Sequence, residues 1–191
     1  MKHNGILVHN SIEIKGVEIF ENKVFDDERG YFLEWFRFSK IRKSMNQDFL
    51  SFSQANFSFS NKGVVRGLHV STEKQYKLVT IASGAIFDTL LDLRIKSNTY
   101  LKHTSIEIDS KNPISILIPP GVAHGFSALS DNVRVMYLVS TEYDPKNEIG
   151  LDPMDQDLQI DWQVSNPILS LKDKNGIALR DFKSKSIEFT Y

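Results

Sequence analysis

The chain has 191 residues, of which 41% are hydrophobic and 25% are charged, and its formal net charge is -1. This length fits one domain with a substantial core, and the near-neutral balance predicts no nucleic-acid partner. The chain contains no cysteine, which excludes disulfides, zinc-thiolate sites, iron-sulfur clusters and thiol nucleophiles. Composition therefore describes an ordinary globular protein and leaves its chemistry open.

The first ten residues, MKHNGILVHN, break up their apolar residues with polar ones, so they lack the apolar centre of a secretory signal. No apolar run in the chain approaches the roughly 20 residues that a membrane-spanning helix requires. We therefore predict a cytoplasmic protein that has no membrane partner.

Short alternating segments separated by turn residues dominate the sequence from residue 11 to about residue 143. Many short strands at such close spacing indicate a β-sandwich or a β-barrel. The predicted strands lie in segments 17–25, 31–38, 50–60, 63–70, 77–84, 85–93, 104–109, 114–121, 124–129 and 133–141.

One helix is predicted in FSKIRKSMNQ, because Phe38, Ile41 and Met45 recur there at helical spacing and Ser39 is a suitable N-cap. The last part of the chain, from about residue 145 to residue 191, is rich in Asp, Pro, Asn and Gly. We expect loops and short turns packed against the main body there, so that residues 1–191 form a single domain.

A second histidine segment follows the turn formed by residues 119–121, where His124 opens a strand that reverses near Ser130 and Asp131. If these two residues form a two-residue hairpin loop, antiparallel pairing sets His124 directly opposite Tyr137, since both lie equally far from the turn. The two side chains are then predicted to share the inward face of one sheet.

The P-x-G-x-x-H pattern that ends at His124 resembles the second signature of the cupin superfamily. That resemblance implies an all-β fold, a cupin-like double-stranded β-helix or jelly roll, with one or two short helices and a pocket between its sheets. Metal-binding cupins carry an H-x-H pair and a downstream carboxylate in their first signature, whereas here only His69 stands at that place. Because a catalytic metal usually needs at least three ligands, we predict no metal.

A wider set of segments comprises DDERGYFLEWF, QANFSFSNKGVVRGLH, KLVTIASGAIFDTLLDLR, IPPGVAHGF, MYLVSTEYDPKNEIGL, IDW and NPILSLKD. Together these segments resemble the dTDP-4-dehydrorhamnose 3,5-epimerase family over most of the chain. Members of that family invert carbon centres beside the 4-keto group of nucleotide-linked 6-deoxy sugars. The resemblance implies no cofactor, because the ketone is already present in the substrate.

Inversion beside a ketone needs a base on one face, a cation or donor at the ketone oxygen, and an acid on the other face. The resemblance implies that His69 is the base and Tyr137 the acid that reprotonates from the opposite side. Lys77 and His124 would stabilise the enolate oxygen, and Asp173 would orient the histidine and raise its basicity.

For nucleotide binding the resemblance implies two arginines, Arg29 and Arg66, whose guanidinium groups fit a diphosphate through bidentate bonds. Family members are homodimers that exchange N-terminal strands, here about residues 1–35, so Arg29 and Glu34 are expected to serve the neighbouring subunit's pocket. The other residues implied in substrate binding are Gln54, Asn56, Glu148 and Lys172, with Tyr143 lining the sugar pocket.

Each of these residues also has a structural interpretation. A single strand histidine such as His69 is more often a hydrogen-bonded core residue, and Tyr137 alone would be a routine strand aromatic. Lys77 would be a solvated edge charge, and Asp173 lies in what looks like a surface turn. Only the presence of all of them together favours catalysis.

Three functions remain open at this point. The first is a 3,5-epimerase of a nucleotide-diphospho-4-keto-6-deoxy sugar in surface polysaccharide synthesis, such as that of a capsule or lipopolysaccharide. The second is a single-carbon epimerase or ketoisomerase on the same scaffold, and the third is a cupin that binds a sugar nucleotide without turning it over. Val70 and Ser71 replace the Tyr-Gln usual in the family, which leaves open dTDP or GDP, hexose or heptose, and one carbon or two.

Overall fold

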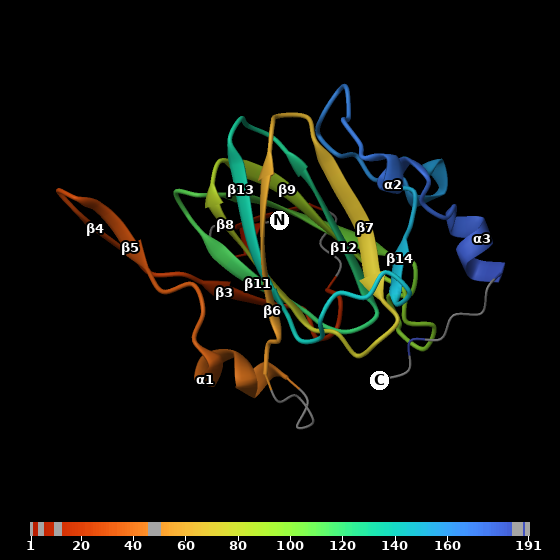
Figure 1. The fold of residues 1–191 in the computed structure, drawn as a ribbon, viewed down its shortest axis with the longest axis horizontal. Helices are drawn as coiled ribbons and strands as arrows, with labels where there is room; N and C mark the ends of the chain where they lie inside the picture. The colour runs from red at the N-terminus through yellow and green to blue at the C-terminus, as the bar shows by residue number, and fades with distance from the viewer. Residues whose placement is uncertain (1, 4–5, 10–12, 46–50, 185–188, 190–191) are drawn as a thin grey trace.

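The computed structural model describes residues 2–3, 6–9, 13–45, 51–184 and 189, which fold mainly into antiparallel strands. The all-β prediction is confirmed. Two sheets face each other and enclose the interior, while a separate hairpin points away from them (Figure 1).

The larger sheet has seven strands in the spatial order β1 (Lys2–His3), β2 (Ile6–His9), β10 (His103–Asp109), β9 (Ala85–Asp92), β12 (Val122–Ala128), β7 (Val65–Ser71) and β14 (Glu148–Gly150). The smaller has five, in the order β3 (Glu18–Glu21), β11 (Ile114–Ile118), β8 (Lys77–Ser83), β13 (Val133–Val139) and β6 (Gln54–Ser60). The hairpin comprises β4 (Val24–Asp27) and β5 (Gly30–Leu33). The helical turns in the described part of the chain are α1 (Phe38–Ile41), η1 (Arg42–Ser44), η2 (Gln156–Leu158), α2 (Leu171–Lys174) and α3 (Leu179–Ser184).

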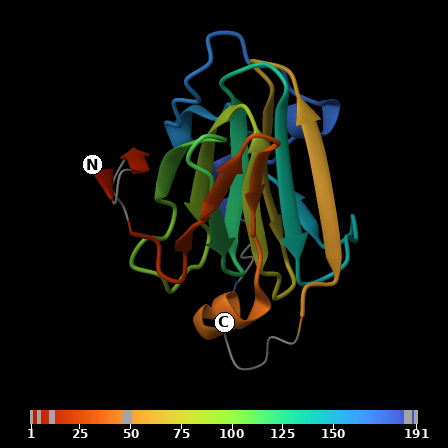
Figure 2. The ribbon, with the colours of Figure 1, turned by 90° about the vertical axis from the view of Figure 1, so that its left-hand side faces the viewer.

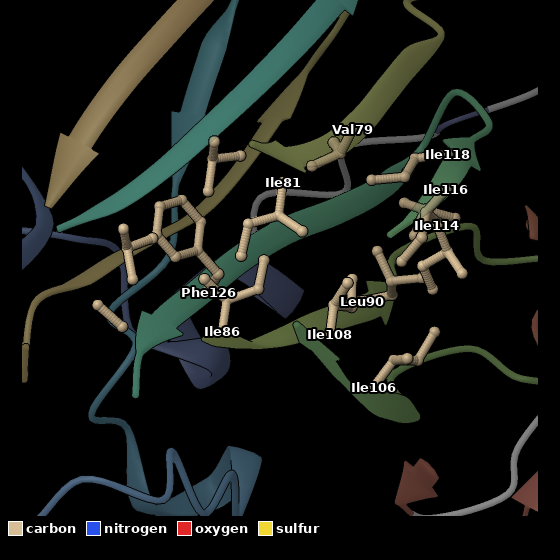
Figure 3. Packing of buried hydrophobic residues seen from close by; sticks show 14 of the residues in the cluster. Val79, Ile81, Ile86, Leu90, Ile106, Ile108, Ile114, Ile116, Ile118 and Phe126 are labelled. Atoms are coloured by element: carbon tan, nitrogen blue, oxygen red, sulfur yellow. The ribbon is translucent and has the colours of Figure 1, made fainter. Parts of the chain in front are cut away.

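Branched aliphatic side chains from both sheets meet in the interior and form the main core (Figure 3). Successive strand residues point to opposite faces, so Val79 and Ile81 of β8 face inward, as Val133 and Val135 of β13 do. Tyr137 has the same parity on β13 and packs against this core. Alternation in the sequence therefore aims the phenol at the space between the sheets.

Two further clusters cover the outer faces of the sheets. Ile41 and Met45, in and just after the short helices α1 and η1, pack on the five-stranded sheet, and Figure 2 shows α1 below the strands. Residues of the C-terminal segment, among them Leu158, Trp162 and Phe182, pack on the seven-stranded sheet. The Trp162 indole N–H donates to the carbonyl of Pro153 at 2.7 Å, so the buried ring also has its polar group satisfied.

The predicted hairpin between His124 and Tyr137 is wrong, because β12 and β13 lie in different sheets. The amide of Ala85 donates to the Ser130 hydroxyl at 2.9 Å, and the amide of Leu129 donates to the Ala85 carbonyl at 2.9 Å. These bonds hold the turn against the start of β9 and lead the chain across to the opposite sheet.

The predicted helix start is also displaced. The helix α1 begins at Phe38, with Arg37 in the N-cap position, so the prediction of Ser39 as N-cap is wrong. No side chain caps this helix, and the chain tightens into a 3₁₀ turn after one α-helical turn. The short helix is held by the apolar contacts of Ile41 rather than by its ends.

Asp92 at the end of β9 organises the loop that leads to β10. Its fully buried carboxylate accepts hydrogen bonds from the Arg94 guanidinium at 2.8 Å, from Ser97 at 2.6 Å and from Thr99 at 2.7 Å. Burial alone would raise the pKa of Asp92, but these hydrogen bonds together lower it below the ordinary value of 3.8. The folded state therefore stabilises the ionised form of the Asp92 carboxyl.

We expect Asp92→Asn to lower the free energy of unfolding at neutral pH by about 3 kcal/mol, because it leaves Arg94 without its buried partner. A pKa lowered by folding contributes stability that is complete above the unfolded value and is lost as the pH falls through the folded value. The difference between wild type and variant should therefore shrink below about pH 4. Urea unfolding at neutral and acidic pH measures this difference, with the exposed Asp157→Asn as control. A difference independent of pH would contradict the assignment.

Candidate active site

A cavity of about 350 Å³ opens between the two sheets near one edge. Strands β6, β8 and β13 supply one wall, and β7, β14 and the helix α2 supply the other. Its lining residues are Gln54, Asn56, His69, Val70, Ser71, Gln75, Lys77, Tyr137, Val139, Glu142, Tyr143, Asp144, Asn147, Glu148 and Lys172.

His69 on β7 is held by a carboxylate that lies 104 residues further along the chain. Its Nε2 lies 2.7 Å from Oδ1 of Asp173, whose side chain is only 5% exposed. Because an ionised carboxylate only accepts hydrogen bonds, Nε2 carries the proton and Nδ1 carries the lone pair. The free nitrogen of this tautomer is the one available to a molecule in the cavity.

Local sequence explains how Asp173 reaches this position. Ser170 is the N-cap of α2: its hydroxyl accepts from the amide of Asp173 at 3.1 Å and donates to that carboxylate at 2.8 Å. Burial would raise the pKa of Asp173, but the hydrogen bonds from His69 and Ser170 together lower it. Asp173 is thus a fixed negative charge that accepts a hydrogen bond from the imidazole and orients its ring.

Tyr137 and Lys77 reach the same cavity from the facing sheet. Tyr137 on β13 pairs with Asn56 on β6, so these two side chains share the inward face. Burial and the negative charge of Glu148 raise the pKa of Tyr137, which keeps its hydroxyl protonated at neutral pH. The Lys77 ammonium lies 5.8 Å from the centre of the tyrosine ring, and burial lowers the pKa of Lys77. An imidazole and a phenol from opposite sheets can remove a proton from one face of a molecule and return one to the other.

Glu148, Lys172 and Tyr143 form a connected group at the rim. The Lys172 ammonium donates to Glu148 at 2.9 Å and to the Tyr143 hydroxyl at 3.3 Å. Burial alone would lower the pKa of Lys172. The hydrogen bond to Glu148 and the negative charge of Glu148 outweigh burial, so the pKa of Lys172 is raised. The other oxygen of Glu148 lies 3.8 Å from Nδ1 of His69.

His124 is placed beside His69 and outside the cavity lining. The two residues are register partners on β12 and β7, and the side chain of His124 is buried. Its Nε2 lies 2.7 Å from Oδ2 of Asp88, a fully buried residue of β9. Because register partners on neighbouring strands point to the same face, His124 shares the inward face with His69 and is buried next to the cavity.

The three remaining residues predicted from the sequence do not line the cavity. Arg66 donates to the Ser60 hydroxyl at 3.0 Å and to the carbonyl of Phe59 at 2.9 Å. Arg29 lies at the tip of the β4–β5 hairpin and pairs with Asp27, and Glu34 follows the same hairpin. Within one chain Arg29 and Glu34 are therefore separated from the other predicted site residues.

Sequence reasoning missed several residues at the site. Asp88 carried a signal, since a carboxylate within the apolar run AIFDTLLDL must find a buried partner. Gln75 precedes strand β8, where alternation makes no prediction, and its amide donates to Thr141 at 2.8 Å. Asn147 lies in a turn whose sequence reveals nothing of the cavity.

No group of three or more His, Cys, Asp or Glu side chains in the described residues is arranged to hold a metal ion. None of the helices in that part of the chain is long and apolar enough to cross a membrane.

Residues 11–181 match the family model for dTDP-4-dehydrorhamnose 3,5-epimerase. The chain belongs to this family. It is 41% identical over 166 residues to the dTDP-4-dehydrorhamnose 3,5-epimerase of Shigella flexneri, which covers 86% of this chain and 91% of that protein. It is 36% identical to the dTDP-4-dehydrorhamnose 3-epimerase of Streptomyces niveus over 86% of this chain and 80% of the relative.

The fold agrees with that assignment. The crystal structure of the dTDP-6-deoxy-D-glucose-3,5-epimerase of Legionella pneumophila, in complex with dTDP-4-keto-L-rhamnose, superposes with a TM-score of 0.86 at 32% identity. It covers 97% of this chain and 98% of that one. The cupin-like fold and the family resemblance predicted from the sequence are both confirmed, and as a member of an epimerase family the chain is an isomerase.

Proposed function

We propose that the chain inverts both C3 and C5 of a dTDP-linked 4-keto-6-deoxy hexose by deprotonation and reprotonation beside the ketone. The observation that carries this proposal is the placement of His69 and Tyr137 on facing sheets around one cavity. The names of the relatives from Shigella flexneri and Legionella pneumophila support the substrate class and the choice of nucleotide.

In this proposal Nδ1 of His69 removes the proton at C5 or C3, and the negative charge that develops on the ketone oxygen is stabilised by Lys77. His124, which shares the inward sheet face with His69, contributes to that stabilisation. Tyr137 then donates its phenolic proton to the opposite face of the same carbon. Asp173 holds the imidazole and lowers the cost of its positive charge in the intermediate.

Charge at the cavity supports a dimer in which chains exchange their N-terminal strands. Among its lining residues three carboxylates, Glu142, Asp144 and Glu148, outnumber the two lysines, Lys77 and Lys172, although a diphosphate needs cations. The β4–β5 hairpin extends from the body (Figure 1), and the side chain of Phe32 on it is 67% exposed. Such an exposed aromatic residue is typical of a segment that packs on another molecule. We propose that Arg29 and Glu34 enter the partner's site, while Arg66, Gln54, Asn56 and Lys172 bind the nucleotide within the chain.

This arrangement predicts complementation between two inactive variants. In a mixed dimer of Arg29→Ala and His69→Ala chains, one site combines an intact His69 with an intact partner arginine. Co-expression should therefore restore up to about a quarter of wild-type activity in the unseparated mixture, since about half of randomly formed dimers are mixed and each has one complete site of two. Mixed dimers isolated through two different purification tags should reach about half of wild-type activity. Activity that stays at the level of the separate variants would show that Arg29 acts within its own chain.

The reaction itself is tested by incubation with candidate 4-keto nucleotide sugars in heavy water, followed by mass spectrometry. Two deuterons in the product support inversion at C3 and C5, and one supports the single-carbon alternative that the Streptomyces niveus relative represents. No uptake with dTDP- or GDP-linked hexoses or heptoses favours a binding protein without turnover. We further propose that the product enters surface polysaccharide synthesis in the cytoplasm.

A further inference from the structure

His69 lies between two carboxylates, and the proposed reaction as stated uses only one of them. Asp173 holds Nε2 at 2.7 Å, whereas Oε1 of Glu148 lies 3.8 Å from Nδ1, the nitrogen that carries the lone pair. A shift of about 1 Å brings that oxygen into hydrogen-bond distance of a protonated Nδ1. Glu148 therefore faces the nitrogen that receives the substrate proton.

The position of Glu148 is fixed by the sheet. Strand β14 pairs with β7, so that Glu148 is opposite Ser71 and Gly150 is opposite His69. The second carboxylate oxygen, Oε2, accepts from Lys172 at 2.9 Å, and the lysine side chain is half exposed at the rim. Oε1 of Glu148 is therefore directed toward the imidazole of His69, while Lys172, bound to Oε2, reaches solvent.

Inversion at two carbons places a demand on this base, because an imidazole that has taken one proton cannot take a second until it loses the first. We propose that Glu148 is the proton exit of His69: Oε1 takes the proton from Nδ1 and passes it to solvent at the rim held by Lys172. In this step the Nδ1–H bond breaks, an O–H bond forms at Glu148, and water then removes that proton. Tyr137 regains its own proton from water, so each inversion releases one proton and takes up one.

This inference rests on the proposed epimerase function and assigns Glu148 a role beyond nucleotide binding. Glu148 acts through His69, so it is a positioning residue for proton transfer and does not itself touch the carbon. A carboxylate that only braced Lys172 would have no effect on the fate of the abstracted proton. That fate can be measured with deuterium.

In heavy water the unconverted substrate gains deuterium when His69 removes a proton, loses it to solvent and returns a deuteron to the same face. Without an exit the original proton is returned. The measured quantity is the amount of deuterium in the remaining substrate divided by the amount of epimer formed. We expect Glu148→Gln to lower this ratio by about 10-fold. The variant should lower kcat by a similar factor, while KM changes little. Added formate, a small carboxylate, should raise both the ratio and kcat toward wild type.

Glu142→Gln is the matched control, because it removes another carboxylate from the same cavity and Glu142 has no ion pair with His69 among the described residues. Its deuterium ratio should equal that of wild type and should not respond to formate. Glu148→Asp keeps a carboxylate at this position and should lie between wild type and Glu148→Gln.

A Glu148→Gln ratio that stays at the wild-type value, or that formate fails to raise, would overturn the assignment of the proton exit. Absence of any deuterium uptake by the wild-type enzyme would instead refute the proposed function. The two failures are therefore distinguishable in one set of measurements.

Discussion

Replacing His69 with alanine is expected to lower kcat/KM by about 10³-fold or more and to remove deuterium uptake at every carbon, since this imidazole is the proposed base for both centres. That loss corresponds to about 4 kcal/mol of transition-state stabilisation. Affinity for dTDP should fall little, because the nucleotide is proposed to be bound by other side chains of the chain and by Arg29 and Glu34 of the neighbouring subunit. Kinetic assays and calorimetric titration with dTDP measure the two quantities separately.

The alanine variant also leaves the buried Asp173 without its imidazole partner, so a loss of stability must be separated from a loss of chemistry. His69→Gln serves this purpose, because its amide nitrogen stands near the position of Nε2 and can donate to Asp173 but is not basic. Both variants should be equally inactive, with the glutamine variant closer to wild type in thermal stability. His103→Gln, at the half-buried first residue of strand β10, is the histidine control and should retain activity. Substantial deuterium uptake by His69→Gln would show that the base is wrongly assigned.

Local patterns in the sequence predict the strands and the direction of several site residues. Tyr137 faces inward because it keeps the parity of Val133 and Val135, and this follows from alternation alone. The short helix that presents Asp173 is interpreted from the sequence as a surface turn, although the serine three residues earlier has a spacing typical of a capping box. Such features depend on neighbours within a few residues, which is why a single sequence can reveal them.

Features that depend on distant contacts were not predictable in the same way. The turn after β12 carries the chain to the other sheet because Ser130 bonds to Ala85, and nothing in the turn's own residues indicates that partner. The short strand that carries Glu148 has no alternation of its own and forms because β7 offers an edge. The link between His69 and Asp173 spans 104 residues, and only the family resemblance suggested it.

The two sheets together explain why one cavity contains both an acid and a base. His69 belongs to the seven-stranded sheet and Tyr137 to the five-stranded sheet, so each side chain approaches from its own wall. Had β12 and β13 formed the hairpin predicted from the sequence, His124 and Tyr137 would have pointed from one face in the same direction. Inversion needs a base and an acid on opposite sides of a carbon, and the two facing sheets of this β-sandwich provide them.

Tyr137→Phe is expected to separate the two halves of the reaction. The variant keeps the ring that packs against the core but lacks the hydroxyl, so formation of the epimer should fall by about 10²- to 10³-fold. His69, Asp173 and Glu148 are unchanged, and they should continue to exchange the substrate proton with solvent on the original face. In heavy water the remaining substrate should thus gain deuterium while little epimer appears, whereas His69→Ala is expected to show neither deuterium uptake nor epimer. Mass spectrometry of separated substrate and product measures both, and parallel loss of exchange and inversion would mean that the phenol is needed for deprotonation and is not the acid of the second face.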